Sequence, residues 1–305
     1  MSDIRRILSI LPLDIRKALE KDENLNSIQE IRIRASKQLI YIKNMEEVIS
    51  DYIVKREDLA YLLKKISNYS IYAFEEELKQ GYITIEGGHR VGICGACVIE
   101  NNKIKTMKDI GSINIRISKD IEGCSKEILK HILRDNRILN TIIISPPKCG
   151  KTTLIRDMGK NISDGIPSMA FKGAKVCIVD ERSEIAACYR GVPQMKVGLR
   201  TDVLDSCPKS YGIMMAIRSM SPEVVICDEI GTYEDIESII VALNCGVGII
   251  STIHGRGIED LYKRPVFKEV LDNKVFERAI VLNNKIGRGN IEYIYDFIEK
   301  SYIDI

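Results

Sequence analysis

The chain has 305 residues, 45% of them hydrophobic and 29% charged, which is enough for two globular domains with sizeable cores. Its 45 basic and 43 acidic residues leave a formal net charge of +2, which excludes a protein that coats nucleic acid through its overall field. No apolar run reaches the ~18 residues that a transmembrane helix needs. Because Asp14 and Arg16 interrupt its apolar start, residues 1–20 predict an amphipathic helix rather than a signal peptide, and we expect a soluble, intracellular protein.

The nine cysteines are an odd number without a repeating spacing, which fits a reducing compartment where thiols pack as small hydrophobes. Cys94 and Cys97 have the spacing of a metal or redox pair. The sequence has no second pair of this spacing, and His89 is the one histidine nearby. We therefore favour packing of Cys94 and Cys97 in the core over zinc or redox chemistry.

The first 122 residues predict an α+β domain with an antiparallel sheet. Alternating apolar residues indicate strands, a Gly87-Gly88 pair indicates a hairpin turn, and helical spacing indicates helices. The predicted helices are 1–20 and 56–79, with a break near Asn68; the predicted strands are 28–34, 39–42, the two arms of the hairpin 81–94, and 113–117. Residues 121–123 are the expected linker.

Four arginines lie on the predicted strand faces of this domain: Arg32, Arg34, Arg90 and Arg116. A solvated sheet surface is the favoured interpretation. The alternative is that some of them reach a phosphate, in this chain or in a neighbouring subunit.

From about residue 125 strands and helices alternate, which is typical of a parallel sheet with helices on both faces. We predict strands at 141–144, 175–179, 223–227, 247–252 and 278–282, and a final pair between Asn290 and Phe297. Helices are predicted at 151–163, near 208–220 and at 233–244.

The segment SPPKCGKTT follows the first of these strands and begins the first helix, which is the context of a phosphate-binding loop. Gly150 lets the backbone approach phosphate oxygens, Lys151 reaches the β- and γ-phosphates, and the Thr152 hydroxyl ligates Mg²⁺. Ser145 stands where the usual pattern has its first glycine. The predicted nucleotide-binding residues are Ser145, Pro146, Pro147, Lys148, Cys149, Gly150, Lys151, Thr152 and Thr153.

Other polar side chains follow neighbouring strands of the predicted sheet, where α/β proteins bind ligands. The strand 223–227 ends in Asp228 and Glu229, the form of a Walker B segment. Asp228 is the predicted second holder of Mg²⁺, and Glu229 is the predicted base that orients and deprotonates the attacking water.

Two further clusters stand at strand ends. The acidic segment 180–184 is either a solvated loop or, as we favour, a source of another carboxylate near the metal or the water, because its strand is expected beside the phosphate loop. Thr252 and His254 lie where a polar group can sense the γ-phosphate, although His254 also fits a structural hydrogen bond in a loop. Arg190, Arg200 and Arg218 are all candidates for a charge-stabilising arginine, and the sequence does not choose among them.

These motifs together resemble the stage III sporulation protein AA family, P-loop ATPases of endospore-forming bacteria that are similar to secretion and pilus-motor ATPases. The resemblance rests on SPPKCGKTTLIRD, VDERSEIAACYRGVPQ, VGLRTDVLDSCPKSYGIMMAIRSMSPEVVICDEIG and STIHG, and extends to residues 29–34 and 112–117. It implies a P-loop NTPase (RecA/ASCE-like) core at 123–305 with a smaller α+β domain at 1–122. Segment 180–184, with Glu184, resembles the acidic box of secretion ATPases, and 252–254 resembles their histidine box.

The resemblance also implies a role. It implies a Mg²⁺-dependent, ring-forming and hexameric ATPase in the cytoplasm of the mother cell. That ATPase would be held at the membrane through other proteins of its operon and would energise a secretion-like complex that faces the forespore. The catalytic residues expected are Glu229, Glu184 and His254. The sequence departs from the secretion motors in having Asp228 directly before the glutamate, where they usually have glycine, which strengthens the metal-holding assignment.

Two other functions share these motifs. One is a nucleotide-switched assembly scaffold with little hydrolysis. The other is an ATPase stimulated by nucleic acid, against which the near-neutral charge and the lack of an aromatic-basic stretch argue. We therefore expect no stable nucleic-acid partner.

Overall fold

The computed structural model describes residues 3–67, 81–147, 149–283 and 289–303. Its contacts divide the chain into two compact units. Unit 1 comprises Met1–Lys119 and Ala187–Gln194, and unit 2 comprises Asp120–Ala186 and Met195–Ile305. The segment 187–194 therefore groups with the N-terminal unit, whereas the sequence prediction placed it in the domain 123–305.

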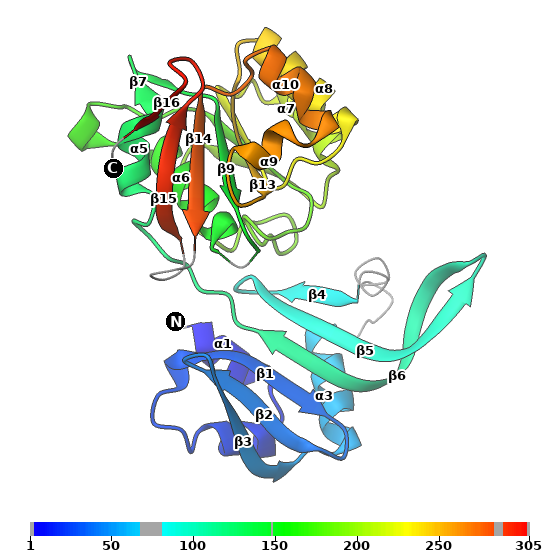
Figure 1. Ribbon diagram of the computed structural model, residues 1–305. Helices are drawn as coiled ribbons and strands as arrows, with labels where there is room; N and C mark the ends of the chain where they lie inside the picture. The colour runs from blue at the N-terminus through cyan, green and yellow to red at the C-terminus, as the bar shows by residue number, and fades with distance from the viewer. Residues whose placement is uncertain (1–2, 68–80, 148, 284–288, 304–305) are drawn as a thin grey trace. The chain divides into compact units, whose positions relative to one another are not determined.

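Unit 1 is built on a six-stranded antiparallel sheet in the order β3-β2-β1-β6-β5-β4 (Figure 1). One face of the sheet carries isoleucines such as Ile31, Ile33 and Ile115, which are fully buried in a core with the helices. The elements are α1 (Asp3–Ile10), α2 (Leu13–Leu19), the short 3₁₀ helix η1 (Leu25–Ser27), β1 (Ile28–Arg34), β2 (Gln38–Lys43), β3 (Glu46–Ile53), α3 (Arg56–Ile66), β4 (Tyr82–Ile85), β5 (His89–Glu100) and β6 (Lys103–Arg116).

Unit 1 differs from the sequence prediction in several places. The predicted helix 1–20 is two helices, because Pro12 lacks a backbone N–H and restricts the residue before it. Strand β3 was missed, since it is a half-exposed edge strand without clean alternation. The part of the predicted helix 56–79 that falls in 68–80 lies outside the described residues. The packing of Cys94 and Cys97 in the core is wrong, because both are exposed on β5.

Unit 2 is built on an eight-stranded sheet in the order β11-β10-β12-β13-β9-β14-β15-β16. The strands from β11 to β14 run parallel, and β15 and β16 are antiparallel additions (Figure 1). The strands are β7 (Leu133–Arg134) and β8 (Arg137–Ile138), which form a separate hairpin, then β9 (Thr141–Ser145), β10 (Val176–Asp180), β11 (Thr201–Asp205), β12 (Val224–Cys227), β13 (Gly248–His254), β14 (Arg278–Asn283), β15 (Asn290–Asp296) and β16 (Ser301–Ile303).

Helices cover both faces of this sheet, which explains why the central strands are apolar throughout rather than alternating. Gly159 of α6 lies so close to one face that a Cβ there would come within 3.0 Å of Ile226. On the other face Val179 packs against Gly212 of α7, and α8 joins the same core. The helices are α5 (Lys126–Ile132), α6 (Lys151–Asp164), η3 (Pro167–Met169), α7 (Lys209–Ser219), α8 (Tyr233–Asn244), α9 (Glu259–Tyr262), η4 (Pro265–Phe267) and α10 (Lys268–Asp272).

The predicted strands and helices of this unit are confirmed with small shifts at their ends, apart from the C-terminal pair. Residues 290–296 form one strand, and its antiparallel partner β16 follows at 301–303, because the turn comes later than the sequence suggested. Strand β11, helix α5 and the β7–β8 hairpin were not predicted. In the described part of the chain, no helix is both long enough and apolar enough to cross a membrane.

Asp157, on the buried side of α6, ties this helix to the segment that precedes α5. Its carboxylate accepts hydrogen bonds from the Gly123 N–H at 2.9 Å, the Ser125 N–H at 2.8 Å and the Ser125 hydroxyl at 2.7 Å. Burial raises the pKa of Asp157, but these hydrogen bonds outweigh it, so the pKa lies below its ordinary value.

Replacing this carboxylate should lower stability. In Asp157→Asn one acceptor oxygen becomes an N–H donor that faces other donors, so we expect a loss of about 1–3 kcal/mol in the free energy of unfolding at pH 7. Urea denaturation followed by circular dichroism measures it. The control is Glu127→Gln on α5, whose ion pair with Lys130 is exposed and should matter little.

The loss should also depend on pH in a defined direction. A carboxylate with a lowered folded-state pKa contributes its full stability above its ordinary pKa of about 4 and loses it as the pH falls through the folded value. The parent and Asp157→Asn should therefore converge in stability at acidic pH. Equal stability at pH 7 would contradict the role given to Asp157.

Candidate phosphate-binding site

The loop between β9 and α6 has the backbone that its sequence predicts. Gly150, directly before α6, has a φ of +89°, a conformation that favours glycine and brings the chain into the first helical turn. Lys151, Thr152 and Thr153 form that turn and are all partly exposed. The N–H groups of the turn are available to an anion, because an α-helix leaves its first amides unpaired.

The first half of the loop is anchored to the sheet. Ser145 is fully buried, and its carbonyl accepts the Gly255 N–H at 3.2 Å. Its hydroxyl donates to the Pro146 carbonyl at 2.9 Å. Pro147 is exposed and Cys149 is buried, whereas Lys148 lies outside the described residues. Ser145 thus fills the usual glycine position with a side chain that bonds inside the loop.

Strand order decides which polar clusters meet the loop. Strand β13 lies between β9 and β12, and β10 lies on the far side of β12. His254 at the end of β13 is therefore the direct neighbour of the loop, in register with Ser145. The expectation that Asp180–Glu184 lies beside the phosphate loop is wrong, because that segment follows β10. Its neighbours are instead the ends of β11 and β12.

A chain of contacts runs from the loop to Glu229 through His254. The Lys151 ammonium lies 2.7 Å from Nδ1 of His254, and Nε2 of the same ring lies 3.4 Å from Oε2 of Glu229. Lys151 also donates to the carbonyls of Ser145 at 3.2 Å and Pro146 at 3.4 Å. Burial lowers the pKa of Lys151. The three predicted residues Lys151, His254 and Glu229 are thus brought together.

These contacts define the tautomer of His254. An ammonium group can only donate, so Nδ1 accepts from Lys151 and carries no proton. The ring proton of the neutral imidazole then sits on Nε2, which faces the Glu229 carboxylate. His254 therefore links a cation on one side to a carboxylate on the other. Its backbone is fixed as well, because Arg264 donates to the His254 carbonyl at 2.5 Å.

Asp228 is a buried carboxylate whose bonding is incomplete. Its Oδ1 has no hydrogen-bond partner among the described residues, and the Lys209 ammonium is 3.7 Å away. The pKa of Asp228 is raised to about 6, chiefly by burial; Asp180 and Glu184 also raise it, and Lys209 opposes the rise. Such an oxygen is a suitable ligand for a hard cation, since burying a charge without a partner is costly.

Lys209, the first residue of α7, was missed by the sequence analysis. Its ammonium lies between Asp228 and Glu181 and neutralises part of their charge. Both carboxylates can still make other contacts. Burial lowers the pKa of Lys209, but the two acids outweigh it and raise it overall. A lysine in a segment such as SCPKSYG gives no signal by itself, and only the position of α7 against β12 reveals its partner.

Asp180 organises the acidic segment through its carboxylate. It is fully buried and accepts the N–H groups of Glu184 at 2.8 Å, Ile185 at 2.9 Å and Ala186 at 2.8 Å. Arg156 of α6 donates to the carbonyls of Glu184 and Ile185. Glu184 is partly exposed and raises the pKa of Asp228, so its charge is felt at the end of β12. The catalytic role of Glu184 stays a prediction.

The donor set suits Mg²⁺ better than a transition metal. Among the described residues no group of three or more His, Cys, Asp and Glu side chains could hold a metal ion. Mg²⁺ commonly takes one or two protein oxygens and completes its shell with substrate phosphates and water. The Thr152 hydroxyl and the orphaned Asp228 oxygen fit that requirement.

Two of the candidate arginines, Arg200 and Arg218, are not part of this edge. Arg200 donates to the Ser163 carbonyl at 2.6 Å, just before β11 begins, and Arg218 is exposed in the last turn of α7. Both lie towards the amino ends of the parallel strands. Arg190 belongs to unit 1 and stacks on Tyr189 at 5.3 Å. Of the sheet arginines in unit 1, Arg32 pairs with Glu30 and Arg90 stacks on Tyr82.

Solved structures with a similar fold include an ATPase and a pilus retraction motor. The chain matches the ATPase DotB of Legionella pneumophila with a TM-score of 0.59 and 16% identity, over 89% of this chain and 76% of that one. It matches the pilus retraction motor PilT, solved with bound ADP, with a TM-score of 0.60 and 14% identity, over 90% and 77% of the two chains. At this identity the likeness shows the fold alone, an α/β unit on a largely parallel sheet together with an N-terminal α+β unit.

Sequence comparison is more specific. The family model described as sporulation stage III, protein AA matches residues 1–301. Stage III sporulation protein AA of Bacillus subtilis (strain 168) is 44% identical over 295 residues, which cover 96% of this chain and 95% of that protein. The chain therefore belongs to the sporulation stage III protein AA family.

Proposed function

We propose that the protein binds ATP at the β9–α6 loop and hydrolyses it. The observation that carries the proposal is the contact chain from Lys151 through His254 to Glu229, beside the buried carboxylate of Asp228, whose Oδ1 has no hydrogen-bond partner among the described residues. The phosphate loop follows β9, His254 ends the adjacent strand β13, and the candidate metal ligand Asp228 and the candidate base Glu229 both follow β12, the next strand along. The names of the similar folds, an ATPase and a pilus retraction motor with bound ADP, support it.

The residues divide the work between binding and chemistry. Ser145 to Thr153 wrap the phosphates, with Lys151 directed to the β- and γ-phosphates. Mg²⁺, when bound by Thr152 and Asp228, supplies charge neutralisation between those phosphates. Glu229 accepts a proton at its carboxylate from the attacking water. Glu184 adds negative charge near Asp228 and helps to hold the water shell.

His254 gives the site a way to sense its substrate. Lys151 is now held by two loop carbonyls and by Nδ1 of His254. Phosphate oxygens would replace these partners, since charge-assisted bonds to phosphate are the stronger ones. His254 would then be released to hold Glu229 through Nε2, or to contact the γ-phosphate. Binding of phosphate at the loop would thereby change the contacts of Glu229, the candidate base.

In the cell, we propose a ring-forming motor, hexameric by analogy with the secretion ATPases. It would work with other stage III sporulation proteins in the mother cell, held at the membrane through them, and would energise their secretion-like complex. The family assignment supports a role in sporulation. Light scattering with and without a non-hydrolysable ATP analogue would report the size of the assembly.

A nucleotide-switched scaffold with little turnover is the second candidate. What favours it is the engaged state of Lys151, which lets nucleotide binding alone change the contacts of His254. The turnover number of the purified oligomer separates the two functions. Stimulation of turnover by single-stranded DNA would instead favour a nucleic-acid-dependent enzyme.

Two substitutions should separate binding from hydrolysis. Lys151→Ala should abolish ATP binding, because it removes the cation directed at the phosphates. Glu229→Gln should keep the affinity for ATP and lose about 10²–10⁴-fold in kcat, the usual contribution of a general base. A fluorescent ATP analogue measures binding, and phosphate release measures turnover.

The matched control is Glu237→Gln on α8, an exposed glutamate that faces solvent. It should bind and turn over ATP like the parent. If Glu229→Gln hydrolyses ATP at the parental rate, Glu229 is not the base. If Lys151→Ala retains the parental affinity, the nucleotide binds elsewhere.

The tautomer of His254 is a further prediction. Without nucleotide, two-dimensional ¹H–¹⁵N NMR of the imidazoles should show His254 with its proton on Nε2, because Nδ1 accepts from Lys151. In Lys151→Ala that preference should weaken, whereas the spectrum of His131 should not change. A proton on Nδ1 in the parent would contradict the contact chain.

A further inference from the structure

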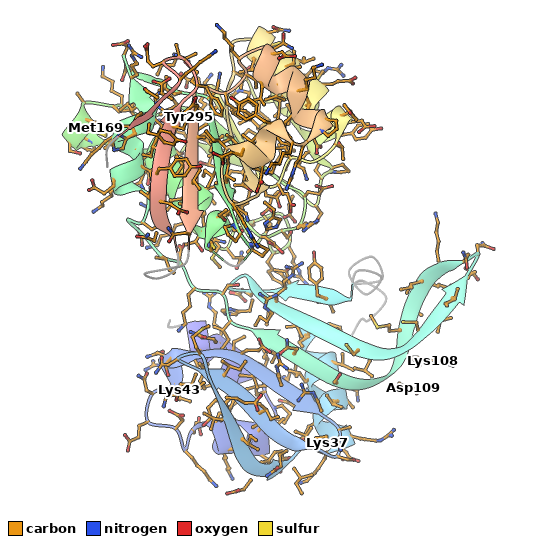
Figure 2. The ribbon with its side chains drawn as sticks, in the orientation of Figure 1. Lys37, Lys43, Lys108, Asp109, Met169 and Tyr295 are labelled. Atoms are coloured by element: carbon orange, nitrogen blue, oxygen red, sulfur yellow. The ribbon has the colours of Figure 1, made fainter. Side chains whose placement is uncertain are left out.

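Strands β5 and β6 continue beyond the sheet of unit 1 as a two-stranded ribbon (Figure 1). β4 pairs with β5 only as far as Gly92, and β1 pairs with β6 only as far as Ser112. We call the part beyond these pairs, residues 94–110, the distal ribbon. In the described chain no third strand joins it. Lys108 and Asp109 mark its bend (Figure 2).

Such a ribbon is poorly stabilised by itself. A two-stranded hairpin is at best marginally stable in water, since it has little apolar surface to bury. Here apolar side chains of the distal ribbon are exposed, with Ile99 at 67% and Ile104 at 41% of their possible surface. These two residues pair across the strands, next to the Val98–Thr106 pair. A partner strand beside the ribbon would extend this row of apolar side chains.

The β6 edge of the distal ribbon is protected against pairing. It carries Lys103, Lys105 and Lys108, and lysines on an edge strand oppose the approach of another strand. The pairing of β5 with β6 has two irregularities in the ribbon, and at both of them β6 has more residues than β5, at Lys105 and at 109–111. Asp109 has a φ of +48°, so the strand is bent there.

The β5 edge lacks these protections. From Cys94 to Ile99 it contains no charged residue and no proline, and none of these residues has a positive φ. Neither register shift inserts a residue into β5. It is therefore a regular, uncharged and open edge, the kind that accepts another strand. The far edge of the same sheet, β3, is by contrast acidic through Glu46, Glu47 and Asp51.

We propose that the β5 edge of the distal ribbon pairs antiparallel with the same edge of a second copy of this chain, centred on Cys97. In this register Gly95 faces Ile99, Ala96 faces Val98 and Cys94 faces Glu100 of the other copy. No like charges oppose each other. Self-pairing of the β6 edge would bring its lysines together, and like charges opposite each other destabilise a sheet.

The charges and the apolar row therefore favour a second copy as the occupant. Glu100 is already paired with Lys105 of its own ribbon at 2.9 Å, so it brings no free charge to the contact. The resulting four-stranded ribbon joins the Ile99–Ile104 row of one copy to that of the other. This contact uses residues of unit 1, whereas the proposed nucleotide site is built from unit 2, and it does not depend on the proposed hydrolysis.

The register makes Cys97 a reporter of the contact. Directly opposed residues of antiparallel strands have Cα atoms about 4.5–5.5 Å apart, which is within the range that a disulfide spans. Cys94 of each copy would face Glu100 of the other copy. Because Cys94 and Glu100 are six residues apart along the strand, the two Cys94 residues would lie about 20 Å apart. Cys97 should therefore cross-link between copies, and Cys94 should not.

The test uses the full-length protein with diamide, which takes up the two electrons and two protons of the thiol pair. In one variant Cys97 is the one exposed cysteine, with Cys94→Ser, Cys124→Ser and Cys245→Ser. The matched variant retains Cys94 and carries Cys97→Ser, Cys124→Ser and Cys245→Ser. Non-reducing electrophoresis should show a linked dimer in the first and none in the second. No dimer in the first, or equal dimer in both, overturns the proposal.

A pair of lysine substitutions tests the edge itself. Val98 and Thr106 are opposite each other on one rung of the ribbon, so Val98→Lys alters the β5 edge and Thr106→Lys alters the β6 edge. In the Cys97 variant, Val98→Lys should abolish the linked dimer and Thr106→Lys should leave it, with circular dichroism unchanged in both. If both lose it or both keep it, the β5 edge is not the contact, and a partner protein becomes the better occupant of the ribbon.

Discussion

The candidate site depends on the position of β13 between β9 and β12. Because His254 ends this strand, its ring reaches the Lys151 ammonium on one side at 2.7 Å and the Glu229 carboxylate on the other at 3.4 Å. An arrangement in which β9 and β12 were direct neighbours would leave no strand end between the loop and Glu229. The strand order therefore makes one imidazole the link between the phosphate loop and the candidate base.

Burial gives the edge its chemistry. The parallel strands are covered on both faces, so the carboxylates at their ends are removed from water and must find partners in the protein or in a ligand. Asp180 is satisfied by three backbone N–H groups and serves the structure. Oδ1 of Asp228 has no hydrogen-bond partner among the described residues, and burial raises the pKa of Asp228 to about 6. The difference between two buried aspartates on adjacent strands separates a structural residue from a candidate ligand.

Sequence patterns were sufficient where structure is local. The apolar runs at 141–144 and 223–227, the glycine before Lys151 and the polar residues after each strand predicted the core elements and most of the candidate site. They failed where the outcome depends on distant contacts. The pairing of β10 with β12 rather than β9 moved Asp180–Glu184 away from the loop, and Lys209 gained its role from packing of α7. Edge strands such as β3 and β11 were missed because their sequences do not alternate between apolar and polar residues. Cys94 and Cys97 are exposed rather than in the core because β5 extends beyond its sheet.

The central claim is that Lys151 exchanges its contacts in the loop for phosphate oxygens when nucleotide binds. A crystal structure of the protein with Mg²⁺ and a non-hydrolysable ATP analogue measures this directly. We expect Lys151 to leave the Ser145 carbonyl and His254 and to contact the γ-phosphate, with Thr152 and Asp228 on the metal side and Glu229 facing the γ-phosphate. A bound analogue with Lys151 still on the Ser145 carbonyl, or bound away from Gly150, would contradict it.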